Sequence, residues 1–130
     1  MANHAKDNPW VKFTKPGKKY PECGFTIYEP GIIKRRRDFA RFVVGVMGLH
    51  FRISCWRRKH GGQTLYDTED LGMKDDFFAN LKFTVEKMTE IAVQVDGWSR
   101  AGTLKESFPE EWVGMTRLKV FKSLREQAKQ

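Results

Sequence analysis

The chain has 130 residues, of which 40% are hydrophobic and 31% are charged, and its formal net charge is +8. This length and composition fit one domain with a real core and exclude wholesale disorder. The longest apolar run, residues 42–49, is too short to cross a bilayer. The first ten residues include Asp7 and lack the apolar stretch of a secretory signal. We therefore expect a soluble intracellular protein of the cytoplasm, nucleoid or nucleus.

The positive charge is concentrated in the N-terminal half of the chain. Residues 1–60 contain fourteen Lys/Arg and four Asp/Glu, a balance of +10, whereas residues 61–130 carry −2. Such a one-sided excess creates a local positive potential that attracts polyanions. Nucleic acid is the expected partner. An acidic protein, a membrane surface and a merely solvated basic face are the alternatives.

Residues 1–24 are predicted to form a basic N-terminal arm, followed by one domain over residues 25–130. The arm mixes Asn, Lys, Pro and Gly with isolated aromatic residues and keeps no regular period. Lysines alternate with aromatic residues in a pattern that suits an arm laid on a phosphate backbone or packed back on the domain, namely Lys12, Lys15, Lys18 and Lys19 with Trp10, Phe13 and Tyr20. The alternative is a mobile, solubilising tail.

Four strands are predicted after the arm. Apolar and polar residues alternate from Gly24 to the turn at Pro30. Residues 39–47 and 49–58 form the next two strands, and residues 63–67 return as a short fourth strand. The third strand alternates most cleanly: one face holds Phe51, Ile53 and Cys55, and the other holds His50, Arg52, Ser54 and Trp56.

Helices are predicted for the rest of the chain. Asp75 and Asp76 favour a helix start, and apolar residues then recur at spacings of three and four as far as Val95. A loop is expected over residues 96–102 and a second helix over about residues 109–127, after a capping box. The fold class is therefore α+β, an antiparallel sheet of about four strands followed by a long helix and a second C-terminal helix. The apolar stripe of the 75–95 helix is wide enough for a homodimer contact as well.

No catalytic or metal-binding motif stands out. The chain has no phosphate-binding loop, no HExxH and no GxSxG, so we expect no enzyme activity, no catalytic residue and no cofactor. Cys23 and Cys55 lack the paired short spacings of a zinc site. A metal site built on Cys55 and His60 is an alternative, but we predict no metal and no disulfide.

A basic and aromatic sheet face is the predicted binding surface. Alternation places Arg37, Phe39 and Arg41 on one face, beside His50, Arg52 and Trp56 of the next strand. Single strands need such a face, because cations neutralise phosphates and aromatic rings stack on bases. Duplex DNA would instead favour a basic helix. The predicted nucleic-acid contacts are Lys18, Lys19, Lys34, Arg35, Arg36, Arg37, Phe39, Arg41, His50, Arg52, Trp56, Arg57, Arg58 and Lys59.

Two structural alternatives apply to this surface. Phe39 and Trp56 could belong to a second small core, with the arginine side chains running past them to solvent. The basic run over residues 34–37 could be only a solvated turn.

The segment over residues 25–95 resembles the positive cofactor four family of transcriptional coactivators. The resemblance rests on Gly48 followed by LHFRISCWRR, on Gly61 in a polar turn, and on LGMKDDFFANLKFTVEKM. It implies a curved four-stranded sheet followed by a helix, dimerisation, and binding of single-stranded DNA on the sheet. By position it also implies contacts from Arg41, Arg52, Trp56, Arg57 and Lys59. The sequence departs from the family in the turn around Gly61, which lacks the lysine-rich Pro-Gly-x-Lys-Gly stretch.

We therefore expect a non-catalytic protein that binds single-stranded DNA or RNA. The alternative function is that of a small structural or regulatory subunit of a larger assembly, such as a ribonucleoprotein, a respiratory complex or a viral inhibitor bound to a host machine.

Overall fold

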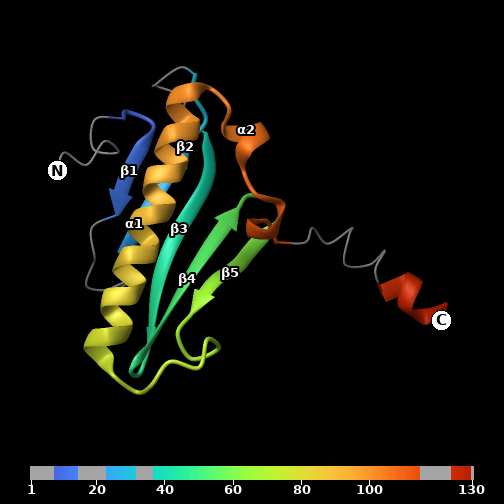
Figure 1. The fold of residues 1–130 in the computed structure, drawn as a ribbon. Coiled ribbons are helices and arrows are strands. Elements are labelled where there is room, and N and C mark those ends of the chain that lie inside the picture. The colour runs from blue at the N-terminus through green and yellow to red at the C-terminus, as the bar shows by residue number, and fades with distance from the viewer. Residues whose placement is uncertain (1–7, 15–22, 32–36, 115–123, 130) are drawn as a thin grey trace.

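A five-stranded antiparallel sheet and one long helix make up most of the structure (Figure 1). The computed structural model describes residues 8–14, 23–31, 37–114 and 124–129. The α+β class, with the sheet first and the long helix after it, is confirmed. The elements are β1 (Val11–Thr14), β2 (Cys23–Tyr28), β3 (Asp38–Met47), β4 (His50–Arg57), β5 (Gly61–Asp67), α1 (Phe77–Ala101), α2 (Leu104–Ser107) and the 3₁₀-helix η3 (Glu110–Trp112).

Each strand pairs with the next one along the chain, so the sheet order is β1-β2-β3-β4-β5. The first strand lies within the segment predicted to be an irregular arm. Val11 pairs with Ile27 and Thr14 pairs with Gly24, which makes β1 an edge strand of the sheet. The sheet thus has five strands, one more than the sequence pattern indicated.

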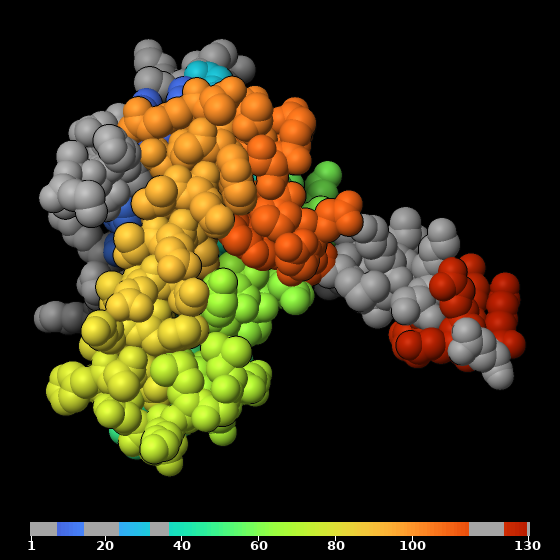
Figure 2. Space-filling view, viewed as in Figure 1, coloured from blue at the N-terminus to red at the C-terminus, as the bar shows by residue number. Residues whose placement is uncertain are grey.

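The core lies between one face of the sheet and α1. Phe25, Phe42 and Cys55 stand opposite one another on three adjacent strands, and each is almost fully buried. Ile91 and Val95 of α1 cover this row, and α1 runs along the sheet as a continuous ridge (Figure 2). Each such buried side chain contributes about 1.5–3 kcal/mol to folding. The predicted core-facing side of β4 is confirmed.

Helix α1 begins where the sequence indicates. The Asp76 carboxylate accepts a hydrogen bond from the Ala79 N–H at 3.1 Å and so caps the first turn. Gly102, with φ of 72°, closes the other end in a left-handed conformation.

The predicted end of this helix is wrong. We expected a loop over residues 96–102, but the helix continues to Ala101. Asp96 is held within the helix by Arg100 one turn later at 3.0 Å, and it also accepts a hydrogen bond from Asn8 at 3.0 Å. This contact with the start of the chain, which the local sequence does not reveal, stabilises the extra turn.

The predicted helix over residues 109–127 is also wrong in its described first part. Pro109 has an extended ψ of 136°, and only the single turn of η3 follows it. Trp112 packs edge-on against Phe42, with ring centroids 5.7 Å apart, so this segment closes the end of the core. Residues 115–123 lie outside the described residues, and residues 124–128 are helical.

Candidate nucleic-acid interface

One row of paired residues crosses all five strands on the sheet face opposite α1. Lys12 pairs with Thr26, Thr26 with Arg41, Arg41 with Trp56, and Trp56 with Gly62. Neighbouring strands lie about 4.8 Å apart, so adjacent side chains in this row stand within reach of one another. The helices α1, α2 and η3 pack on the other face, against the core. We call the face that holds this row the open face.

Trp56 is the large aromatic residue of the open face. Its side chain is 50% exposed, and its ring lies over the Cα of Gly62 on β5. A β-carbon at Gly62 would stand 2.9 Å from two atoms of the indole. The glycine therefore leaves room for the ring to pack against the neighbouring strand, while half of the Trp56 side chain stays exposed.

A shallow depression of about 210 Å³ lies beside Trp56 on the open face. It is small in comparison with pockets for drug-sized ligands, which measure about 300–1,000 Å³. A shallow depression of this size can accept part of an extended ligand that lies across the sheet. The lining residues are Arg41, Val43, Gly45, Met47, Arg52, Ser54 and Trp56.

The two arginines of this depression differ in their partners. Arg52 donates from Nε to a carboxylate oxygen of Asp67 at 2.9 Å. Burial raises the pKa of Asp67, but the Arg52 hydrogen bond and two backbone N–H groups outweigh burial and lower this pKa overall. Arg41 is exposed and pairs with no carboxylate of the described residues. Arg41 therefore offers its charge to a ligand more freely than Arg52 does.

Phe39 does not lie on the open face, and the prediction that it shares a face with Arg37 and Arg41 is wrong. Its side chain is only 3% exposed. The pairing of β2 with β3 shifts at this point, because Ile27 pairs with Ala40 and Tyr28 with Asp38. Phe39 is thus the extra residue of a β-bulge, and the bulge turns its side chain to the core.

Phe39 instead supports Arg57 at the end of β4. The Arg57 guanidinium stands over the Phe39 ring at 3.8 Å from its centroid, with the Phe108 ring at 5.5 Å. The alternative of a second small core is therefore also wrong for Phe39: the residue is buried beside an arginine, but it belongs to the main core. Trp56 is half exposed and is not part of it.

Three further predicted contacts surround the same end of the sheet. Arg37 precedes β3, and Arg58 and Lys59 follow β4 in the turn to β5. All three are exposed. Lys59 has a φ of 63°, so this turn holds a non-glycine residue in the left-handed region.

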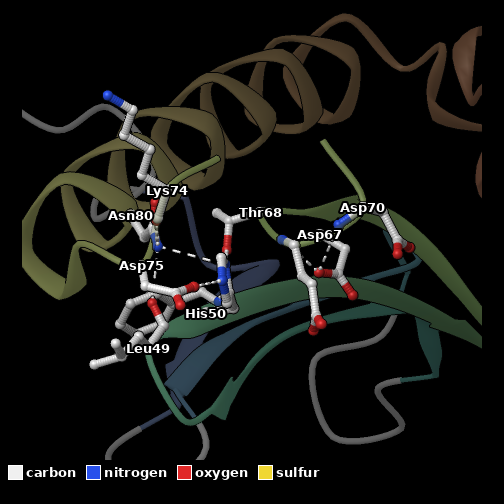
Figure 3. A network of polar contacts seen from close by, with 10 residues as sticks. Leu49, His50, Asp67, Thr68, Asp70, Lys74, Asp75 and Asn80 are labelled. Atoms are coloured by element: carbon white, nitrogen blue, oxygen red, sulfur yellow. Dashed lines mark hydrogen bonds and ion pairs between the residues drawn. The ribbon is translucent and has the colours of Figure 1, made fainter. Parts of the chain in front are cut away.

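His50 lies in a polar network that is buried except at Asp75, and it does not lie on the open face (Figure 3). Its Nδ1 is 2.8 Å from the Thr68 hydroxyl, and its Nε2 is 2.8 Å from a carboxylate oxygen of Asp75. Asn80 completes the network by donating to the Leu49 carbonyl at 2.9 Å. The prediction of an outward His50 is therefore wrong. At the first position of β4, next to the turn, the side chain closes over the start of α1.

The order Thr68, His50, Asp75 has the composition of a nucleophile, base and orienting acid. The Thr68 hydroxyl, however, accepts the Phe51 N–H at 3.0 Å, and Thr68 is only 1% exposed. A substrate has no access to this oxygen, so the arrangement ties β4, the β5–α1 loop and α1 together.

The described residues do not favour a reactive cysteine or a metal site. Burial raises the pKa of the Cys55 thiol to about 12, the opposite of what a reactive thiolate requires. No group of three His, Cys, Asp or Glu side chains in the described ranges could hold a metal ion. Within the same ranges, no helix is long and apolar enough to cross a membrane.

Five of the predicted contacts lie outside the described residues, namely Lys18, Lys19, Lys34, Arg35 and Arg36. Sequence reasoning, in turn, left Lys12 and Gly62 out of the predicted site. Lys12 was assigned to an arm and Gly62 to a turn, and only the pairing of β1 and β5 brings them into the row.

Comparisons with protein-family models, curated proteins and solved structures gave no match, so a functional assignment depends on the residues of this chain alone.

Proposed function

We propose that this protein binds single-stranded nucleic acid on the open face of its sheet. The observation that carries this proposal is the pairing of Arg41 with Trp56: an exposed cation that forms no ion pair within the described residues stands beside a half-exposed indole that packs against Gly62 of the neighbouring strand. The arginine would neutralise a phosphate while the ring stacks on a base. Stacking on an aromatic side chain is worth about 1–3 kcal/mol per base.

The charges and shape of the two faces favour a single strand over a duplex. The helices described contain no basic surface suited to a DNA groove, because the exposed side of α1 mixes Lys82 with Glu86 and Glu90. The open face is a strand surface with a shallow depression, over which splayed bases can lie.

The order of elements supports the same proposal. A sheet followed by a long helix is what the resemblance of residues 25–95 to the positive cofactor four family implies. Members of that family bind single-stranded DNA on the sheet. The strand β1, formed by Val11–Thr14, is an addition to that family's four strands.

The test is a fluorescence-anisotropy titration with a mixed-sequence oligonucleotide as single-stranded DNA, as RNA and as duplex DNA, at two salt concentrations. We expect the single strands to bind more tightly than the duplex. The logarithm of the affinity should fall with the logarithm of salt concentration at a slope of about −0.7 per phosphate neutralised. Absence of saturable binding at low salt would refute the proposal, and the DNA and RNA arms decide between the two single-strand ligands.

Matched variants locate the binding surface. Trp56→Ala should weaken binding about tenfold, as expected for one lost stacking contact, and change the melting temperature little. Phe78→Ala removes an even more exposed aromatic residue at the start of α1 and should leave binding unchanged. For charge, Arg41→Gln should reduce the salt slope by about one phosphate, whereas Lys82→Gln on α1 should not.

A role as a subunit of a larger assembly is the second candidate, and one apolar surface favours it. Val46, Met47 and Leu49 are exposed in and beside the β3–β4 turn, and Phe78 is 77% exposed at the start of α1. The turn and the helix start lie at the same end of the molecule, where Asn80 hydrogen-bonds Leu49 (Figure 1). Exposed apolar patches of this kind are typical of protein contacts. Replacing Val46 and Phe78 with Glu should improve solubility if this role is correct, without affecting oligonucleotide binding, because neither residue lines the depression on the open face.

A further inference from the structure

A second hollow lies at the corner of the sheet where β3 begins and β4 ends. It has a volume of about 250 Å³ and shares Arg41 and Trp56 with the row on the open face. This volume is below the range of pockets that enclose a whole drug-sized ligand, so it suits one small group of a larger ligand. The lining residues are Asp38, Phe39, Arg41, Trp56, Arg57 and Arg58.

The hollow has a net positive charge. Three guanidinium groups and one carboxylate line it, which leaves two positive charges in excess. Arg41, Arg57 and Arg58 form no ion pair with any carboxylate of the described residues. Arg52 and Arg100 show the contrast, because each pairs with an aspartate at 2.9–3.0 Å. The corner therefore gathers three arginine side chains that form no ion pair within the described part of the chain, although the Glu29 carboxylate acts electrostatically on Arg57.

Arg57 is held in position before any ligand binds. Its guanidinium rests on the Phe39 ring at 3.8 Å from the centroid, and its Nε is buried with no hydrogen-bond partner among the described residues. Burial lowers the pKa of this guanidinium, which reflects its loss of contact with water. The Glu29 carboxylate offsets part of this effect without forming an ion pair with Arg57, so an anion bound at the terminal guanidinium nitrogens would still stabilise this partly desolvated cation.

We propose that this hollow binds the terminal phosphate of a single strand, with the terminal base stacked on Trp56. The inference rests on the proposed function and names the part of the ligand that the corner recognises. A terminal phosphate has a charge of about −1.5 to −2 and three acceptor oxygens, whereas an internal phosphodiester has a single negative charge. Two excess positive charges on three guanidinium groups, of which that of Arg57 is held against the Phe39 ring, match the former.

The experiment compares one oligonucleotide in three forms: with a 5′-phosphate, with a 3′-phosphate, and with hydroxyl groups at both ends. The fluorophore is attached away from the end being tested, and binding is measured by anisotropy at one salt concentration. We expect a terminal phosphate to tighten binding about tenfold over the hydroxyl form, the gain of charge-assisted hydrogen bonds. The form with the higher affinity identifies the end that enters the hollow, and equal gains at both ends mean that the hollow accepts either monoester.

Variants test whether the preference for a terminal phosphate arises from residues of the hollow. Arg57→Lys and Arg58→Gln should each remove most of the preference for a terminal phosphate. Arg58 is exposed, so its variant keeps the test decisive even if Arg57→Lys is poorly folded. Arg52→Gln, on the same face but outside the hollow, should lower the affinity for all three forms and keep the preference.

The outcomes separate this inference from the proposed function. Equal affinity for all three forms would overturn the terminal-phosphate site and leave single-strand binding intact. A preference that persists in both hollow variants would also overturn it. Failure of every form to bind would refute the proposed function itself.

Discussion

The indole of Trp56 lies over Gly62 on the neighbouring strand, so closely that a β-carbon at Gly62 would stand 2.9 Å from two ring atoms. A glycine in a strand interior normally weakens the sheet, because it has no side chain to pack. In this protein the Trp56 ring packs over Gly62, while half of the Trp56 side chain stays exposed to solvent. The pair therefore defines the position of the aromatic surface on which our functional proposal depends.

Gly62→Ala should displace this ring. The obstructing atoms belong to the far edge of an exposed side chain, which can move away, so we expect the melting temperature to change by only a few degrees. Affinity for a single strand should fall by up to about tenfold, because the β-carbon displaces the ring from the position beside Arg41 in which it would stack on a base. Thermal melts and anisotropy titrations measure the two effects.

Gly24→Ala is the control for this variant. A β-carbon at Gly24 would overlap the carbonyl oxygen of Phe42, a backbone atom that has nowhere to move. This substitution should lower the free energy of unfolding by about 3 kcal/mol or more. Wild-type affinity in Gly62→Ala would show that the ring position is irrelevant to binding.

His50→Ala should affect folding and not binding. The imidazole bridges Thr68 and Asp75 in the buried network, so its removal should lower the free energy of unfolding by about 1–3 kcal/mol. Single-strand affinity of the folded protein should stay unchanged, because the side chain is turned away from the open face. Urea unfolding and anisotropy test this. Lys59→Gln, in the exposed turn after β4, should show the reverse: lower affinity with nearly unchanged stability. If His50→Ala loses affinity for a single strand while its free energy of unfolding is unchanged, His50 belongs to the binding surface and this interpretation is wrong.

Local patterns predict the middle of this fold well. The period of two in β4 correctly places Phe51, Ile53 and Cys55 in the core, because burial alternates regularly from Phe51 to Trp56. The start of α1 at Asp76 follows from a local rule as well, since its side chain caps its own helix.

The parts that sequence reasoning missed depend on partners far along the chain. The strand Val11–Thr14 is recognisable only through its pairing with β2. The face of Phe39 is reversed by a single bulged residue, since a shift of one position moves a side chain to the other side of a sheet. The last turn of α1 depends on Asn8, nearly ninety positions earlier, through its hydrogen bond to Asp96. Trp56 was predicted on the correct face, but its contact with Gly62 required the β4–β5 register.

Cys55 should be unreactive in the native protein. Its thiol is buried, and burial raises its pKa to about 12, so almost no thiolate exists at neutral pH. In a Cys23→Ser background, alkylation by iodoacetamide should be slow in the native state and fast in urea. Mass spectrometry of the labelled protein measures both rates. Rapid native labelling would mean that β4 opens readily or that the thiolate is stabilised.

Asp67 should make the protein less stable in acid. Burial raises the pKa of this carboxyl, but the hydrogen bonds from Arg52 and from the backbone N–H groups of Glu69 and Asp70 lower it overall. The folded-state pKa is then below the unfolded value of about 3.9, so the unfolded state binds more protons between the two values. The stabilisation is therefore fully present above the unfolded pKa and is lost as pH falls through the folded pKa.

Asp67→Asn should remove this dependence. At neutral pH the variant should be less stable by about 1–2 kcal/mol, a modest cost because the Arg52 side chain is 42% exposed. The drop in its free energy of unfolding between about pH 7 and about pH 3 should be smaller than in the wild type. Urea titrations at several pH values provide these free energies. Asp70→Asn, in the same loop, is the matched control and should retain the wild-type pH dependence. If Asp67→Asn and the wild type lose equal stability in acid, the Arg52–Asp67 pair is not the source of the pKa shift.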